Sequence, residues 1–183
     1  MIFIFIYLFI LFSISYSCKC GDTVECFVKG STLHVEGTGE MYQTNDYYRN
    51  CSWTKERNKI TNVSITSGIT SLGYGLLKNL KTHTIVIPKT VTILGDYCFS
   101  KCQFEELSLP AKISKIGRYC FYGSSLNFIH LTKNIVSIGS NSLDSTKINR
   151  IRIPSSLTNI PQGAFHFAKL TKIIFEEGVE GLG

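Results

Sequence analysis

A short apolar motif recurs along this chain at a constant interval of 22 residues, and it constrains the fold more than any other feature of the sequence. Each copy is a run of three residues with an apolar residue first and third, as in Ile85-Val86-Ile87. The copies begin at Val63, Ile85, Leu107, Ile129, Ile151 and Ile173, with no shift in register. A unit of this length buries too little apolar surface alone, so successive units have to stack to form a core.

Further columns of residues keep the same interval. A column of glycines indicates a backbone position that needs either a positive φ or close approach to the next coil. Its members are Gly73, Gly95, Gly117, Gly139 and Gly183, with Pro161 as the one substitution. A column of large apolar residues follows at Leu77, Phe99, Phe121, Leu143 and Phe165. Because these columns stay in register, we expect their apolar side chains to form one continuous core.

The alternating motif has the period of a β-strand with one buried face. Successive strands should pair in parallel, about 4.8 Å apart. Proline ends the motif in several copies, as at Pro88, and it stops the strand because it cannot donate to the ladder. Residues 96–101 and their equivalents are long enough for one helical turn. The sequence therefore predicts a right-handed stack of β/α coils, with a parallel β-sheet on the concave face.

The first 17 residues are predicted to be a signal peptide. Residues 1–12 are all apolar except Tyr7, and small residues follow at Ser13, Ser15 and Ser17. Such a run is too short to cross a bilayer, which needs about 20 residues, and it matches the apolar core of a secretory signal. A buried N-terminal strand or helix and a retained membrane anchor are the alternatives.

Residues 18–59 are predicted to form an N-terminal β-hairpin cap, and residues 60–183 the repeats, the last of them incomplete. The hairpin pattern alternates over residues 24–28 and 33–35, around Lys29-Gly30-Ser31. A solenoid needs such a cap because its first coil would otherwise expose its core to water. The opposite end carries no cap in this sequence. Either the sequence is a fragment, or this end stacks on another molecule and supports self-association.

Secretion affects how the seven cysteines are interpreted, since disulfides persist outside the reducing cytosol. Four of them cluster before the repeats, at Cys18, Cys20, Cys26 and Cys51. We favour a bond from Cys51 to Cys20 or Cys26, although the spacing alone permits three pairings. Cys98 and Cys120 share a column with Ala164, so we expect buried thiols there. Asn50 and Asn62 begin glycosylation sequons.

Catalytic, metal-binding and nucleic-acid-binding functions find little support. No G-x-S-x-G, H-E-x-x-H or P-loop motif occurs, and no cofactor or small-molecule substrate is implied. A metal site at His83, Glu105, Glu106 and His130 would spread its ligands over about 10 Å. The net charge of +6 is distributed along the chain without long basic runs, which disfavours nucleic acid. The chain is therefore predicted to be a binding scaffold and not an enzyme.

The repeat pattern is I-x-I-P, then V/I-x-x-I-G, then a small residue and Phe, and it resembles the BspA-like class of leucine-rich repeats. The N-terminal segment is similar too, because residues 20–24, residues 32–41 and Trp53 follow the order of motifs in that family. The resemblance implies a leucine-rich-repeat solenoid that is secreted or held at the cell surface. Family members are described as adhesins or surface antigens that bind host proteins and sometimes other microbes.

Residues that flank the buried strand positions should face the concave side, the usual binding surface of curved solenoids. The predicted ligand-binding residues there are Phe128, His130, Arg150, Arg152, Glu105 and Glu106. Exposed aromatic and arginine side chains are typical of binding hot spots. We therefore expect a protein ligand, namely a host matrix protein, a host cell-surface protein or a microbial surface. The alternative is a structural or self-associating module, or a fragment of a longer surface protein.

Overall fold

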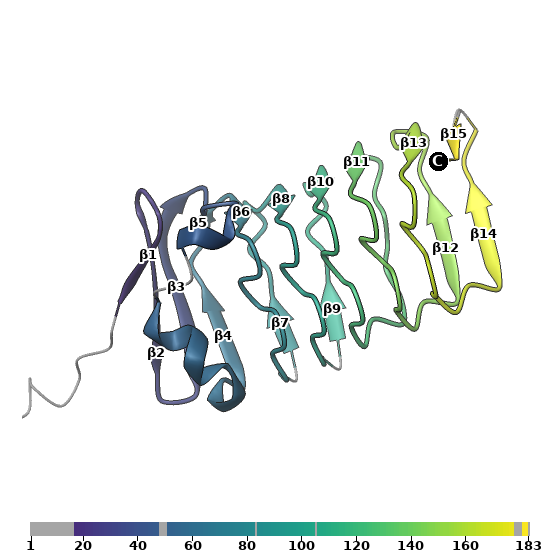
Figure 1. The fold of residues 1–183 in the computed structure, drawn as a ribbon. Helices are drawn as coiled ribbons and strands as arrows, with labels where there is room; N and C mark the ends of the chain where they lie inside the picture. Colours follow the sequence, from purple (N-terminus) through teal and green to yellow (C-terminus); the bar gives the residue numbers. More distant parts are fainter. Residues whose placement is uncertain (1–16, 48–50, 83, 105, 178–180, 183) are drawn as a thin grey trace, which may run out of the picture.

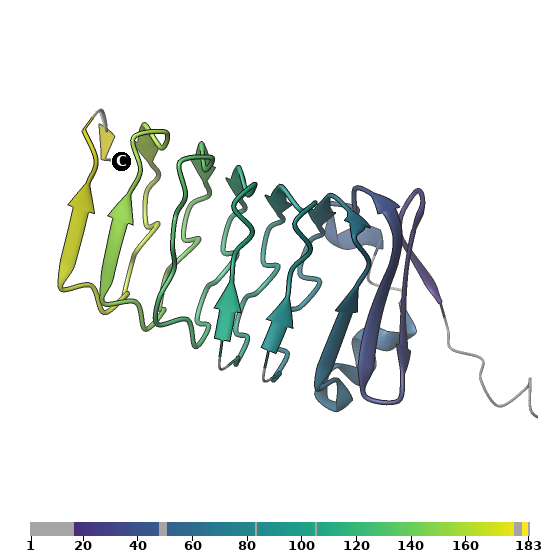
Figure 2. The same ribbon diagram turned by 180° about the vertical axis from the view of Figure 1, so that it is seen from behind.

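The computed structural model describes residues 17–47, 51–82, 84–104, 106–177 and 181–182, and these form a stack of coils (Figure 1). The predicted signal peptide lies outside these residues except for Ser17. A β-hairpin occupies the N-terminal end of the stack, and the chain then advances one coil per repeat (Figure 2). Among the described helices, none combines the length and the apolar composition that crossing a membrane requires.

The N-terminal sheet joins the hairpin to the first repeat. Strands β1 (Cys18–Gly21), β2 (Val24–Lys29) and β3 (Thr32–Gly39) pair antiparallel in sequence order. On its other edge, β3 pairs in parallel with β4 (Asn62–Ile65) and β5 (Gly68–Ile69). Two short 3₁₀ helices, η1 (Asn45–Tyr47) and η2 (Ser52–Lys59), lie in the connection between β3 and β4. The hairpin thus covers the edge that β4 would otherwise present to solvent.

Short parallel strands form two rows along the stack. The first row follows the predicted motif and contains β4, β7 (Thr84–Val86), β9 (Glu106–Ser108), β12 (Arg150–Ile153) and β14 (Lys172–Phe175). The second precedes the glycine column and contains β6 (Ser71–Leu72), β8 (Ile93–Leu94), β10 (Lys115–Ile116), β11 (Ser137–Ile138), β13 (Asn159–Ile160) and β15 (Gly181–Leu182). Paired residues are 22 apart, as in Ile85 with Leu107 and Ile116 with Ile138, so the predicted register is present.

The predicted helical turn on the outer side of each coil is absent from the described residues, and turns occupy its place. Tyr97 and Lys101 have left-handed φ values of 58° and 55°, and equivalent residues in the other coils do the same. A right-handed helix does not tolerate such residues. Successive backbone amides of the turn instead donate alternately to the next coil and within their own coil. Phe99 donates to the Cys120 carbonyl of the next coil at 2.8 Å, and Ser100 donates to the Tyr97 carbonyl of its own coil at 3.0 Å. The β/α description of the coil was therefore wrong.

The glycine column exists because neighbouring coils approach closely there, and not because of its φ. Gly95, Gly117 and Gly139 all lack a positive φ. A Cβ atom on Gly117 would lie 2.6 Å from the Asp96 nitrogen and 2.6 Å from the Gly95 carbonyl carbon. The Gly117 amide donates to the Leu94 carbonyl at 2.8 Å. Pro161 has no amide hydrogen for the equivalent bond, and β11 and β13 are not paired.

The core is continuous from the hairpin into the repeats, and its centre is the column of large apolar side chains. Phe99 and Phe121 are fully buried and stack with ring centroids 5.1 Å apart. Phe104 packs edge-on against Phe99 at 6.3 Å. On the last described strand of the first row, Ile173 and Phe175 are 40 % and 43 % exposed, because β14 pairs only with β12.

Replacing either stacked ring should destabilise the protein strongly. We expect Phe99→Ala and Phe121→Ala each to lower the free energy of unfolding by about 3–5 kcal/mol, because each leaves a cavity in the core. Phe167→Ala is the matched control, since that side chain is 76 % exposed. Chemical denaturation measures all three. A core variant as stable as the control would contradict the assigned column.

The glycine column makes a second prediction about stability. Gly117→Ala should lower the free energy of unfolding more than Gly30→Ala, because the added Cβ atom at position 117 meets the backbone of the preceding coil. Gly30 has a φ of +61° but open space around it, so its substitution adds only left-handed strain, about 1–2 kcal/mol. Thermal melts of the two variants test this order. A smaller effect at Gly117 would show that the coils do not need close approach there.

Candidate functional site

The predicted binding residues lie on the strand side of the fourth and fifth repeats. Phe128 is 64 % exposed and His130 is exposed, and they flank the buried Ile129. Arg150 and Arg152 are both exposed and flank the buried Ile151 on β12. Since side chains alternate along a strand, each pair points away from the core.

Of the two predicted acidic residues, the structure describes only one. Glu106 begins β9, whereas Glu105 lies outside the described residues. A different acid contacts the patch, because Glu176 Oε1 lies 3.7 Å from Arg152 Nη1. Both side chains are more than one-third exposed, so this ion pair contributes little stability. Glu176 was not predicted from the sequence, although the parallel register of β12 and β14 places it close to Arg152.

Residues 127–131 interrupt the first row of strands. Within the described residues, their backbone N–H and C=O groups make no hydrogen bond, and neither β9 nor β12 pairs with them. A groove of about 360 Å³ lies between this segment and β9, and its lining includes Phe128, His130 and the half-buried Leu107. The segment therefore offers unpaired backbone groups next to apolar surface.

A second groove, of about 640 Å³, lies on the other side of β9. Strand β7 contributes Val86, which is 73 % exposed, and the turns after the strands contribute Lys89 and Lys112. The strand side thus carries two grooves on either side of β9, each with one exposed apolar side chain. The alternation of the repeat motif implies that Val86, between the buried Ile85 and Ile87, lies on this face, but nothing in the sequence distinguishes it.

Two disulfides hold the N-terminal segment, and the favoured pairing of Cys51 was wrong. The structure pairs Cys18 with Cys51 and Cys20 with Cys26, with Cα–Cα distances of 5.6 and 5.9 Å. The reason is strand β1, which the predicted hairpin did not include. Because β1 pairs with β2, it brings both Cys18 and Cys20 close to Cys26. The strand register places Cys18 opposite Cys26 and shifts between Lys19 and Gly21, and it is Cys20, at this shift, that bonds to Cys26, while Cys18 bonds to Cys51.

The repeat cysteines Cys98, Cys102 and Cys120 are free and buried. Burial raises the pKa of Cys102 to about 12, and it also raises the pKa values of Cys98 and Cys120 well above the ordinary range. Cys102 Sγ also donates to the Leu77 carbonyl at 2.7 Å. Because the thiolate is the nucleophile, these groups are unreactive at neutral pH.

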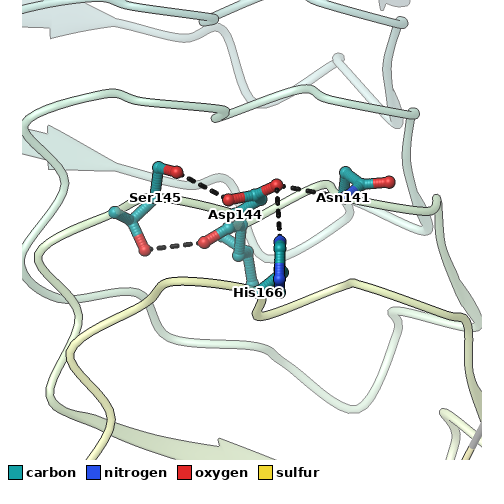
Figure 3. Close-up of polar contacts among 6 residues, drawn as sticks. Asn141, Asp144, Ser145 and His166 are labelled. Atoms are coloured by element: carbon teal, nitrogen blue, oxygen red, sulfur yellow. Dashed lines mark hydrogen bonds and ion pairs between the residues drawn. The ribbon is translucent and has the colours of Figure 1, made fainter.

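A polar cluster surrounds the buried carboxylate of Asp144 (Figure 3). Asn141 Nδ2 donates to it at 3.0 Å and Ser145 Oγ at 2.6 Å, while His166 Nδ1 lies 3.7 Å away. The residue types match a catalytic triad, but the serine hydroxyl donates to the aspartate and not to the histidine. A nucleophile needs that contact with its base, so the cluster satisfies a buried charge. The 22-residue spacing of Asp144 and His166 would have revealed the pair.

The described residues contain no group of three or more His, Cys, Asp or Glu side chains arranged to hold a metal ion. Asn62, the second predicted glycosylation position, is exposed at the start of β4. Asn50 lies outside the described residues.

The stacked parallel coils define a repeat solenoid, and the sequence profile of one family matches it. The model of the BspA type leucine rich repeat region matches residues 46–104 and 92–183, in six copies. This chain belongs to the BspA-type leucine-rich-repeat family. The match begins within the segment predicted as the cap. Leucine-rich repeats of this family generally mediate protein–protein contacts and are generally non-enzymatic.

Two solved structures are similar to this chain. One is a leucine-rich repeat protein from Eubacterium ventriosum, with 21 % sequence identity and a TM-score of 0.48. The alignment covers 92 % of this chain and 62 % of that protein, so this chain spans less than two thirds of its length. The other is a leucine-rich repeat protein from Bacteroides ovatus, with 13 % identity, a TM-score of 0.38, and coverage of 89 % and 78 %. No curated protein sequence is significantly similar.

The disulfides and thiols predict a simple digestion pattern. Trypsin cuts after Lys19, so residues 20–29 should be released with an internal disulfide, while the peptide ending at Lys19 stays bonded to residues 50–55. Cys98, Cys102 and Cys120 should resist alkylation at pH 8 until the protein is unfolded, because burial keeps them protonated. Mass spectrometry after native and denaturing alkylation measures both. A bond between peptides 20–29 and 50–55 would contradict the pairing.

Proposed function

We propose that this chain is a secreted or cell-surface protein that binds a protein partner through the strand face around residues 127–131. The exposure of Phe128 carries the proposal. This ring is 64 % exposed beside a groove and an unpaired backbone segment, and apolar surface that borders a groove is typical of interaction sites. Aromatic and arginine side chains are also enriched among residues that dominate binding energy, and Arg150 and Arg152 occupy the neighbouring repeat.

The backbone of residues 127–131 supports the same proposal. Its N–H and C=O groups are free to pair with an extended segment of a partner, a common mode of peptide recognition. The groove beside Phe128 provides apolar contact, and the arginines would fix orientation through charge. Glu176, by pairing with Arg152, competes with an acidic group of the partner. We expect the partner to be a host matrix or cell-surface protein, or a protein of a microbial surface.

Secretion is part of the proposal. Two disulfides before the repeats suit an oxidising compartment, and the apolar run of residues 1–12 suits a signal peptide spanning residues 1–17. We assign residues 18–59 to the cap and 60–183 to the repeats. Asn50 and Asn62 would accept glycans in a host that glycosylates secreted proteins.

Self-association is the second candidate. Ile173 and Phe175 on β14 are exposed, and a second copy stacked on that strand would bury them. Sedimentation of the purified chain at several concentrations distinguishes the two candidates, because a protein that acts through self-association forms dimers without any ligand.

The binding proposal is tested by a pair of variants matched in charge and in aromatic content. In the first, Phe128, His130, Arg150 and Arg152 are changed to Ser. In the second, the same change is made at Phe167, His166, Lys115 and Arg118, which are also exposed. Binding to epithelial cells and immobilised matrix proteins is measured after both variants are shown to melt like the wild type. We expect the first to lose at least about tenfold in affinity and the second to bind normally. Equal loss in both would contradict the proposal.

A further inference from the structure

One edge of the stack carries a row of lysines that the protein-binding face does not use. It is the edge at which the chain enters β7 and β9, the lower edge in Figure 1. The column at this edge contains Lys59, Lys81, Gln103, Ser125, Lys147 and Lys169, each 22 residues from the next. All four lysines are exposed.

No acidic residue occupies the sequence columns that form this edge. The column itself, the two before it and the one after it include no Asp or Glu at any repeat. Lys59 lies 3.6 Å from Glu56, a surface pair that salt and solvent screen. Lys81, Lys147 and Lys169 make no ion pair within the described residues. The row therefore presents two pairs of positive charges, with Gln103 and Ser125 between them.

A groove of about 610 Å³ runs between the two lysine pairs and is polar. Lys81 and Lys147 stand at its ends, and Gln103, Ser124 and Ser125 line its middle. Lys81 also borders a further groove of about 640 Å³ toward Lys55 and Thr61, so the two grooves adjoin.

Two buried hydroxyl groups in the groove have no hydrogen-bond partner among the residues that the structure describes. Thr82 Oγ1 and Ser124 Oγ make no hydrogen bond, although their side chains are only 6 % and 3 % exposed. A buried hydroxyl without a partner is unfavourable, because it has lost its hydrogen bonds to water. A ligand that brings hydroxyl groups or ordered water into the groove would supply those partners.

We propose that this edge binds a linear polysaccharide carrying carboxylate or sulfate groups. Successive coils are about 4.8 Å apart, so Lys81 and Lys147 are separated by about 15 Å. That exceeds the Debye length at physiological salt, about 8 Å. The lysine pairs therefore act as two separate anion contacts that one polymer can span, which raises its affinity through effective concentration. Between them, the hydroxyl and amide groups suit the neutral hydroxyls of a sugar chain.

The groove is less suited to nucleic acid, the other common linear polyanion. Proteins that bind single strands place exposed aromatic rings under the bases. The one ring that lines this groove belongs to Phe104, and it is 9 % exposed. This site lies on a different edge from the protein partner proposed above. Phe104 and Ser125 border both grooves, but none of the residues substituted to test one site lines the groove of the other.

The test measures binding of the purified chain to heparin, hyaluronan and neutral dextran, with single-stranded DNA as a fourth arm. Heparin carries sulfate as well as carboxylate groups, whereas hyaluronan carries carboxylate groups alone, so the comparison shows whether sulfate is required. We expect at least one of these two to bind with an affinity that falls steeply as salt rises, and dextran not to bind. Failure of both acidic glycans, or DNA binding as tight as the better glycan, would overturn the proposal.

Two variants localise the site. Changing Lys59, Lys81, Lys147 and Lys169 to Gln should weaken glycan binding about tenfold or more and reduce its salt dependence. The matched control changes Lys29, Lys89, Lys112 and Lys133 to Gln, which removes the same charge from exposed positions elsewhere. We expect it to lose no more than about twofold. Equal loss in both variants would mean unspecific attraction and would overturn the proposal.

The groove has its own variant, Thr82→Val combined with Ser124→Ala. A purely structural role of the hydroxyls predicts a change in melting temperature without a change in affinity. The proposal predicts weaker glycan binding with a melting temperature that does not fall, since both hydroxyls are unpaired in the free protein. Unchanged affinity would exclude the groove from the site.

Discussion

The structure depends on the close approach of successive coils at the glycine column. There the backbone of one coil lies against the backbone of the preceding coil, as at Gly117 beside Gly95 and Asp96. The same approach lets amides donate from coil to coil, which is why the outer turns need no helix to satisfy their backbone groups. Because this contact fixes the distance between successive coils, the large apolar side chains stack on one another and the strands pair in register.

This regular contact explains why irregular places stand out. Pro161 removes one amide donor from the second row, between β11 and β13. Residues 127–131 remain unpaired in the first row, beside the exposed Phe128. Strands β4 and β7 are not paired with each other either among the described residues. Residues 127–131 combine unpaired backbone with an exposed aromatic ring, and this combination is why we place the proposed partner there.

Much of the fold could be predicted from the sequence, because one spacing links every column to its neighbours. The strand register, the buried Phe99 and Phe121, and the hairpin over residues 24–35 followed from that spacing and from alternation. The outer turns did not, because Tyr97 and Lys101 adopt left-handed φ values that their residue types do not suggest. Strand β1 was missed since Cys18–Gly21 has no alternating pattern, and the disulfide pairing was missed with it.

The candidate site was predictable only in its composition. Alternation placed Phe128, His130, Arg150 and Arg152 on one face. The sequence of residues 127–131 follows the same pattern as the copies that do pair, so the missing backbone hydrogen bonds could not be predicted from it.

Residue-resolved amide hydrogen exchange on the purified chain tests the account most directly, because it reports both the hydrogen bonds between coils and the segment where they are missing. We predict slow exchange at Phe99, Gly117 and Phe121, and fast exchange at residues 127–131. Protection of residues 127–131 equal to that of Gly117 would contradict it.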